Sequence, residues 1–328
     1  MSQPRFVPDD VLFPGLLRRL NERTCLPGPL LEQLVLGSLP AAGAAEVTAH
    51  VKDCLSCLST FSRLQSLHES SGPRPRLILD VPSARRLRQE MADLARLEEE
   101  PGVAPPVLVA GESGTGKGLV AWEIHVLSRR AAHAFVEVDC TALPASRLEL
   151  ELFGYERGRS PDVEGAAPGL FEAADGGTLF LHDIDALSLD LQGKLLAAIE
   201  SRSVRRLGGV AARSLDVRVI AATHADLGDA VRRGTFRADL LARFAGSTLT
   251  LLPLRERPDD ILPLARHFAA RLAQREGEVR RLTRDAEERL RRYRWPGNVR
   301  ELSTVIQRAV MRRGREEIGA EELGLPSI

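Results

Sequence analysis

A glycine-rich stretch in the first half of the chain carries the residue types that bind phosphate. It reads GESGTGKG and lies between a short apolar run and a helical pattern. In that setting the backbone N–H groups curl around phosphate oxygens, and the N-terminus of the following helix adds the positive end of its dipole. Lys117 would reach the β- and γ-phosphates. The sequence therefore predicts an ATP site formed by Gly111, Glu112, Ser113, Gly114, Thr115, Gly116, Lys117, Gly118 and Leu119.

A second polar site is predicted where a buried strand ends. The apolar run 178–181 is followed directly by His182 and Asp183. Nucleotide hydrolases usually place two carboxylates at such a strand end, one near Mg²⁺ and one to activate water. Here the first position is an imidazole, which is a poor ligand for Mg²⁺. The hydroxyl residue that normally follows the phosphate-loop lysine is replaced by Gly118, so we expect Mg²⁺ binding to be weak.

Four residues near the amino terminus have the types and spacing of a Zn²⁺ site. Cys25, His50, Cys54 and Cys57 form the pattern C-x₂₄-H-x₃-C-x₂-C. Thiolate and imidazole are the ligands of tetrahedral Zn²⁺, and His50 and Cys54 lie one helical turn apart. Three interpretations stay open: a structural zinc ion in a small core, a redox switch whose thiolates pair on oxidation, and cysteines that are simply buried.

The bulk composition excludes several classes of protein. Lys plus Arg and Asp plus Glu both number 45 in 328 residues, so there is no overall charge to attract nucleic acid or an anionic membrane. No apolar window reaches the length of a transmembrane helix, and the amino terminus lacks a secretory pattern. We therefore expect a cytoplasmic protein that does not contact membranes.

Changes in sequence texture predict the domain organisation. Residues 1–70 are rich in Leu and Ala and predict a small all-α zinc-binding domain, followed by a Ser/Gly/Pro linker over 71–76. Residues 77–253 alternate short apolar runs with helical stretches, which predicts an α/β domain with a parallel sheet flanked by helices. Residues 254–328 read as helical throughout and predict a helical lid.

Between residues 77 and 326 the motifs resemble, in order, the AAA+ P-loop domain of bacterial enhancer-binding proteins, which remodel the sigma-54 form of RNA polymerase. The matching stretches include GESGTGKG, GLFEAADGGTLFLHDID, VRVIAATHADL, GTFRADLLARF and YRWPGNVREL. The resemblance implies a hexameric ATPase ring with nucleotide between neighbouring subunits. It implies that Arg300 is the lid arginine that senses nucleotide. It also implies that Arg237 and Arg243 stabilise charge on a neighbour's γ-phosphate.

Four positions expected around the γ-phosphate depart from that family. The family's Asp-Glu pair is His182–Asp183, the Asn that restrains the catalytic Glu is Asp139, and the sensor Asn is His224. Asp183 is one methylene shorter than the family's general base, so we predict slow or lost hydrolysis. The alternative is a rearranged centre in which Asp183, Asp139 and a histidine still organise Mg²⁺ and water.

The expected partner is a protein rather than DNA. The family contacts sigma-54 through a GAFTGA loop, and residues 158–163 read GRSPDV instead, without the aromatic and threonine residues. The amino-terminal pattern resembles the zinc-binding anti-sigma-factor domain, so we expect that domain and the 158–163 loop to contact a sigma factor or another regulator. Because no helix-turn-helix pattern is found after the lid, we expect no direct DNA binding. Three hypotheses remain: an ATPase that remodels another client, a nucleotide-gated scaffold, and a conventional sigma-54 activator.

Overall fold

The computed structural model describes two compact units of the chain. The described residues are 47–48, 81–97, 104–157, 166–276, 281–311 and 317–326. The larger unit comprises Pro75–Phe153, Gly169–Arg205 and Ala211–Ile328 and contains the predicted nucleotide site. The four predicted zinc ligands and the 158–163 loop lie outside the described residues, so the zinc site and the partner loop stay predictions.

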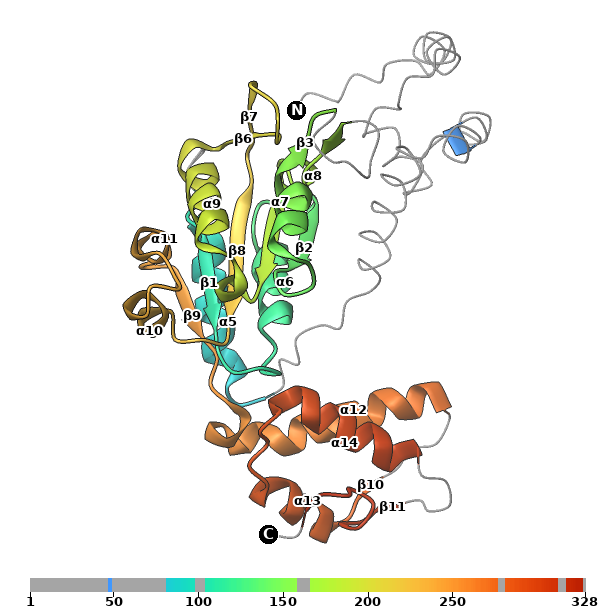
Figure 1. Ribbon diagram of the computed structural model, residues 1–328. Coiled ribbons are helices and arrows are strands. Elements are labelled where there is room, and N and C mark those ends of the chain that lie inside the picture. Colours follow the sequence, from blue (N-terminus) through green and yellow to red (C-terminus); the bar gives the residue numbers. More distant parts are fainter. Residues whose placement is uncertain are drawn as a thin grey trace. The chain divides into compact units, whose positions relative to one another are not determined.

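A five-stranded parallel sheet forms the centre of the larger unit (Figure 1). Its order is β2-β5-β8-β1-β9, and every neighbouring pair is parallel. The parallel sheet and its flanking helices confirm the predicted α/β class. The strands are β1 (Val107–Ala110), β2 (Phe135–Asp139), β5 (Thr178–His182), β8 (Arg218–Thr223) and β9 (Thr248–Thr250).

Helices cover the sheet on both faces. On one face, α5 and α6 bury an apolar cluster with alternate strand residues, among them Val109, Phe180 and Ile220. The register places Val219 on the opposite face, where α8 and α9 lie. The helices of this part are α5 (Ala84–Arg96), α6 (Lys117–Leu127), α7 (Ala145–Phe153), α8 (Leu170–Ala173), α9 (Leu189–Ser201), α10 (Leu227–Arg232) and α11 (Ala238–Arg243), with the 3-10 turn η1 (Ile184–Ala186) and the hairpin of β6 (Ser203–Arg205) and β7 (Ala212–Ser214).

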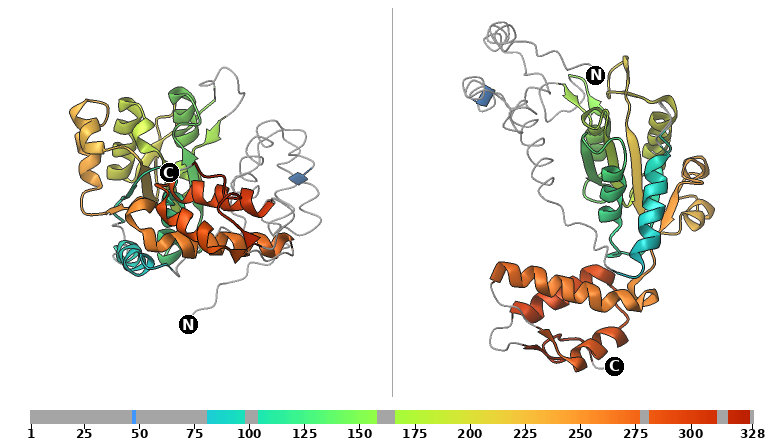
Figure 2. Two further views of the ribbon diagram at one scale, coloured as in Figure 1. Left: turned by 90° about the horizontal axis from the view of Figure 1, so that it is seen from below. Right: turned by 180° about the vertical axis from the view of Figure 1, so that it is seen from behind.

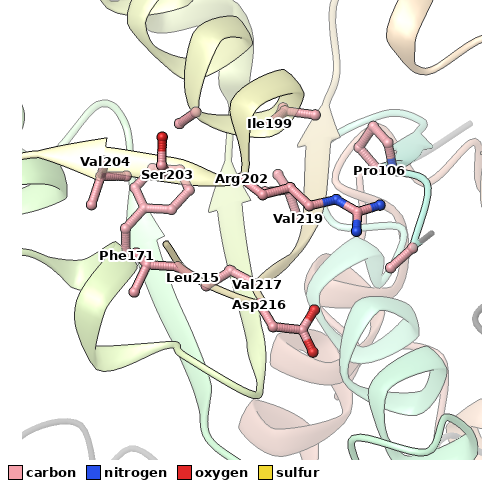
Figure 3. A pocket seen from close by; sticks show the side chains of 12 residues that line it. Pro106, Phe171, Ile199, Arg202, Ser203, Val204, Leu215, Asp216, Val217 and Val219 are labelled. Carbon is pink, nitrogen blue, oxygen red and sulfur yellow. The ribbon is translucent and has the colours of Figure 1, made fainter. Parts of the chain in front are cut away.

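A small pocket lies where α8, α9 and β8 meet (Figure 3). Phe171, Ile199 and Val219 line it together with the charged side chains of Arg202 and Asp216. Its cavity volume of 30 Å³ compares with the roughly 10–15 Å³ that one water needs by the same measure. The pocket is therefore far too small to hold a nucleotide.

The smaller unit contains a short antiparallel pair, β3 (Gly154–Tyr155) with β4 (Ala167–Pro168). Tyr155 also bridges to Leu207, and the N–H of Leu207 donates to the carbonyl oxygen of Gly154. β3 directly precedes the predicted partner loop along the chain, so this pair flanks the loop's two ends.

The carboxyl-terminal part of the larger unit has its own apolar core. In both views α12 and α14 lie side by side (Figures 1 and 2). The elements are η2 (Leu254–Glu256), η3 (Pro258–Asp260), α12 (Ile261–Glu276), α13 (Arg284–Arg292) and α14 (Asn298–Met311), with two short strands, β10 (Arg281–Leu282) and β11 (Glu317–Ile318).

The expectation that this part is helical throughout was wrong in one respect. β10 and β11 pair in parallel, and Leu282 and Ile318 pack on the lid core. Two-residue strands are too short to produce an alternating pattern in a sequence, so only the tertiary contact reveals them.

Among the described residues, no helix combines the length and apolar character needed to cross a membrane.

Trp295 anchors the lid core. It is fully buried, its indole N–H donates to the carbonyl oxygen of Leu290 at 2.9 Å, and its ring meets Tyr293 edge-on at 5.0 Å. His125 is also fully buried, with Nδ1 at 2.9 Å from Thr178 Oγ1. Cys140 is buried, and burial raises the pKa of its thiol to about 12.

Replacing Trp295 should destabilise the protein strongly. A buried Trp replaced by Ala leaves a cavity and costs about 3–5 kcal/mol. The adjacent and exposed Arg294 provides the control, since Arg294→Ala should change stability by no more than about 0.5 kcal/mol. Urea unfolding followed by circular dichroism measures both. Equal stabilities of the two variants would contradict the assignment of Trp295 to the lid core.

Candidate nucleotide site

The phosphate loop connects β1 to α6 in the conformation that its glycines permit. Gly111, Gly114 and Gly116 have positive φ angles of 149°, 79° and 105°. A Cβ on Gly114 would lie 2.2 Å from the carbonyl oxygen of Gly297, so the close approach of the lid requires glycine there. Gly116 caps α6, and the N-terminus of that helix therefore opens onto the loop.

Lys117 lies over this loop. Its ammonium group donates to the carbonyl oxygens of Gly111 at 2.7 Å and Glu112 at 3.1 Å. Burial lowers the pKa of Lys117, and the carboxylate of Asp183 partly offsets that effect. A cation that is half-buried beside a glycine loop is what a nucleotide phosphate requires.

The lid contacts the loop through α14. The side-chain amide of the buried Asn298 donates to Glu112 Oε2 at 3.1 Å and to the carbonyl oxygen of Ser113 at 2.9 Å. The guanidinium of Arg300 donates to Ser113 Oγ at 3.0 Å. The backbone N–H groups of Val299 and Arg300 both donate to the carbonyl oxygen of Gly114. The structure thus brings the predicted lid arginine to the predicted phosphate loop.

Glu112 joins the loop to the lid by an ion pair. Arg255 donates to both of its carboxylate oxygens, at 2.8 and 2.6 Å. The hydrogen bonds from Arg255 and then Asn298 lower the pKa of Glu112 to about 2. Sequence reasoning missed Arg255 and Asn298 as site residues. Both lie in stretches that resemble the enhancer-binding family, but their partner on the loop is set by the fold.

His182 lies at the end of β5 and packs against the loop. Its ring centroid is 4.2 Å from that of Phe180, and a Cβ on Gly118 would lie 3.2 Å from His182 Cε1. Burial lowers the pKa of His182, which favours the neutral imidazole. Neither His182 nor Gly118 offers an oxygen ligand. The residues at the usual Mg²⁺ position therefore do not fit that ion.

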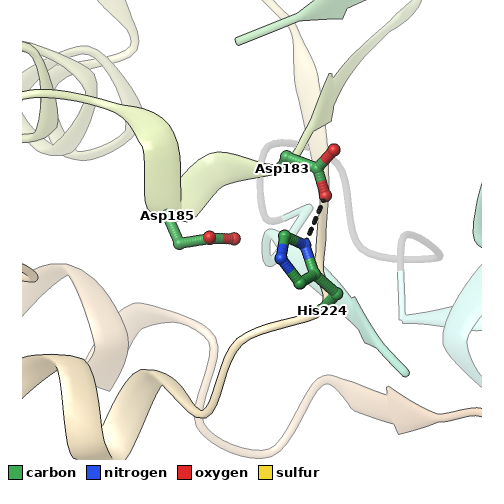
Figure 4. Close-up of side chains that lie close together, drawn as sticks. All are labelled: Asp183, Asp185 and His224. Atoms are coloured by element: carbon green, nitrogen blue, oxygen red, sulfur yellow. Dashed lines mark hydrogen bonds and ion pairs between the residues drawn. The ribbon is translucent and has the colours of Figure 1, made fainter. Parts of the chain in front are cut away.

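A second group of side chains lies at the same end of the sheet. One ligand atom from each of Asp183, Asp185 and His224 lies within 4.8 Å of the other two (Figure 4). Asp183 Oδ1 accepts a hydrogen bond from His224 Nδ1 at 3.0 Å, and Asp185 Oδ1 accepts one from Thr223 Oγ1 at 2.5 Å. Asp183 adopts left-handed backbone angles, with φ at 48°. Sequence reasoning missed Asp185, although the alternation of acids in HDID was its available signal.

The carboxylate of Asp139 is hydrogen-bonded to a residue of its own turn, Thr141. Its Oδ1 accepts hydrogen bonds from the Thr141 N–H at 2.8 Å and from Thr141 Oγ1 at 2.6 Å. The hydroxyl of Thr141 is the main cause of the lowered pKa of Asp139. Asp139 pairs in register with His182 across β2 and β5, but its carboxylate caps its own turn.

The two predicted trans-acting arginines lie at the ends of α11. Arg237 forms a bidentate pair with Asp239 at 3.0 and 2.7 Å, and Arg243 forms an ion pair with Glu200. Their side chains are 41% and 51% exposed. In the part of the chain that the structure describes, neither guanidinium is hydrogen-bonded to the phosphate loop. Exposed pairs exchange readily, so both cations are accessible to a second molecule.

Substitution of Glu112 by Gln should reduce the thermal stability in a pH-dependent way. The pKa of about 2 lies below the ordinary 4.5, so the carboxylate's contribution is complete above pH 4.5 and is lost as the pH falls toward 2. Glu112→Gln should lower Tm at neutral pH, and the difference from wild type should narrow below pH 4.5. Glu256→Gln removes a neighbouring carboxylate as the control. A Tm difference that does not change with pH would contradict the assigned ion pair.

Comparison with known proteins places this geometry in a family. Residues 80–250 match the sigma-54 interaction domain, and residues 255–325 match the AAA+ ATPase lid domain. The chain is 42% identical over 292 residues to the nitric oxide reductase transcription regulator NorR1 of Cupriavidus necator, covering 86% of this chain and 56% of that protein. It is 42% identical over 260 residues to the sigma54-dependent transcriptional regulator SfnR of Pseudomonas fluorescens, covering 78% of this chain and 71% of that one.

The fold is also similar to that of solved structures. NtrX from Brucella abortus, crystallised in complex with ATP, superposes with a TM-score of 0.69 at 29% identity, covering 84% of this chain and 61% of that chain. The same protein in complex with ADP has a TM-score of 0.67. The chain thus spans little more than half the length of several of its relatives. On the evidence of both matched domains, this chain belongs to the sigma-54 interaction domain family of AAA+ proteins.

Proposed function

We propose that this chain is an ATP-binding AAA+ subunit that takes part in transcriptional regulation and hydrolyses ATP slowly. One observation carries the proposal: Lys117, the phosphate loop and Arg300 of the lid lie together with hydrogen bonds between loop and lid. The ATP complex of the similar NtrX supports nucleotide as the ligand. The curated relatives, which are transcription regulators, support the process.

We expect slow hydrolysis because of the residues at the end of β5, His182 and Asp183. His182 lies against Gly118 where oxygen ligands are expected, and Asp183 is shorter than the Glu of the family. Asp183 also shares its carboxylate with His224, which reduces its freedom to take a proton from water. Loss of a well-placed base costs about 10²–10⁴ in rate. The site therefore favours prolonged ATP occupancy over rapid turnover.

Assembly into a ring is the second element of the proposal. Arg237 and Arg243 are exposed and lack a phosphate partner within the described part of their own chain. A ring would place them at a neighbour's γ-phosphate, as the family resemblance implies. The domain limits in this proposal are 1–70, 77–253 and 254–328, with a linker at 71–76.

The amino-terminal domain and the 158–163 loop supply the partner contacts. Cys25, His50, Cys54 and Cys57 have the chemistry of a Zn²⁺ site that would stabilise a small domain. The loop replaces an aromatic–threonine tip by Ser, Pro and Asp, which favours a client other than sigma-54.

Lys117→Ala should weaken ATP binding by about 10- to 100-fold, because it removes a charge-assisted phosphate contact. Lys194→Ala is the matched control, since Lys194 on α9 pairs with Asp190 of the same helix and with Glu149 of α7 instead of with the phosphate loop. Titration with a fluorescent ATP analogue measures the affinities. Equal affinity of Lys117→Ala and wild type would overturn the nucleotide site.

Steady-state hydrolysis separates a slow ATPase from a fast one. The double variant His182→Asp/Asp183→Glu restores the family's carboxylate pair and should turn over ATP about 10² times faster than wild type. Lys117→Ala supplies the background rate. Rapid turnover by the wild-type chain, with no gain in the double variant, would refute the impaired centre.

The loop sequence predicts that this chain does not capture sigma-54 in the presence of an ATP transition-state mimic. A pull-down with purified sigma-54, and with a sigma-54-dependent activator as the positive control, measures this. A stable complex that forms only with the mimic would establish the conventional activator instead.

A further inference from the structure

A cation that accompanies ATP needs oxygen ligands, and the usual position at the end of β5 lacks them. His182 is held by the ring of Phe180 and lies against Gly118. Serine or threonine at position 118 would have to share this space with the imidazole. The chain has therefore lost both conventional contacts to Mg²⁺ together.

Asp183, Asp185 and His224 provide a different set of ligands one step further along the same edge. The carboxyl ends of β5 and β8 are neighbours because these strands pair in parallel. Asp183 and Asp185 follow β5, and His224 follows β8. Their ligand atoms lie within 4.8 Å of one another, and Figure 4 shows the two carboxylates approaching the imidazole from different sides.

Hydrogen bonds orient the carboxylates of Asp183 and Asp185. Thr223 donates to one oxygen of Asp185, and His224 Nδ1 bonds one oxygen of Asp183, which leaves the other oxygens and the second imidazole nitrogen for a ligand. The carboxylates are half-buried and the imidazole is exposed, so an ion can enter from solvent. β1, which the phosphate loop follows, pairs in parallel with β8, so the loop and His224 open at the same edge of the sheet.

Two carboxylates and one imidazole are not the ligands that Mg²⁺ selects. Mg²⁺ prefers oxygen alone, whereas an added imidazole favours ions such as Zn²⁺, and carboxylate–imidazole sites also take Mn²⁺. Three protein ligands leave coordination positions for water or a phosphate oxygen.

We propose that Asp183, Asp185 and His224 bind a divalent transition-metal ion beside the phosphate loop, in place of Mg²⁺ at the conventional strand-end position. The inference deepens the proposed function and rests on it for the ion's role with ATP. Binding of the metal itself depends only on the three side chains, so the two can fail separately.

Mn²⁺ alone, without nucleotide, is the probe, and the full chain is the sample. The amino-terminal Cys and His residues would compete for Zn²⁺, whereas Mn²⁺ binds thiolate poorly. Loss of the free Mn²⁺ signal in electron paramagnetic resonance measures affinity, and spin-echo modulation detects a coordinated imidazole nitrogen. The wild-type chain should bind Mn²⁺ with nitrogen coupling. His224→Asn should abolish that coupling, and Asp185→Asn should weaken binding by at least about tenfold.

Two further variants decide the assignment. His182→Asn should keep both the affinity and the nitrogen coupling, because His182 is not a ligand in this proposal. Lys117→Ala should lose ATP affinity and still bind Mn²⁺, which separates the metal site from the nucleotide site. Nitrogen coupling that disappears in His182→Asn, or wild-type affinity in Asp185→Asn, would overturn the proposed ligands.

Discussion

The parallel pairing of β5, β8 and β1 is the constraint on which the site depends. Parallel strands end at a common edge, so loops that are far apart in sequence open into one space. The phosphate loop follows β1, His182 and Asp183 end β5, and His224 follows β8. A one-residue slip in register would turn every one of these side chains to the other face. The apolar strand interiors hold that register by burial on both faces.

Hydrogen bonds of the buried Asn298 join the lid to this edge of the sheet. Asn298 is buried with φ at 52°, its Oδ1 accepts from the Leu254 N–H, and its amide donates to Glu112 and Ser113. A buried polar group without a partner is costly, so breaking these bonds while Asn298 stays buried would be unfavourable. The phosphate loop and the lid are therefore physically linked through Glu112 and Asn298.

The departures at the strand end form one rearrangement instead of several independent losses. His182 and Gly118 occupy one space, so the histidine is compatible with glycine and crowded by any larger residue. Beside that space lie two carboxylates and one imidazole, those of Asp183, Asp185 and His224. Under the proposed function, Lys117 and the glycine loop contact phosphate, whereas the residues proposed to hold the cation differ in kind from the oxygen ligands that Mg²⁺ prefers.

The sequence by itself predicted the strands of the central sheet, the glycine loop and the class of fold, because glycine spacing and apolar runs are local signals. The roles proposed for Lys117 and Arg300 rest on motifs for the same reason. Only the tertiary structure decided that Arg255 pairs with Glu112, that Asp139 caps its own turn, and that Asp185 joins Asp183 and His224. Those contacts join residues whose spacing in sequence carries no signal, since a parallel sheet brings distant strand ends together without leaving a pattern along the chain.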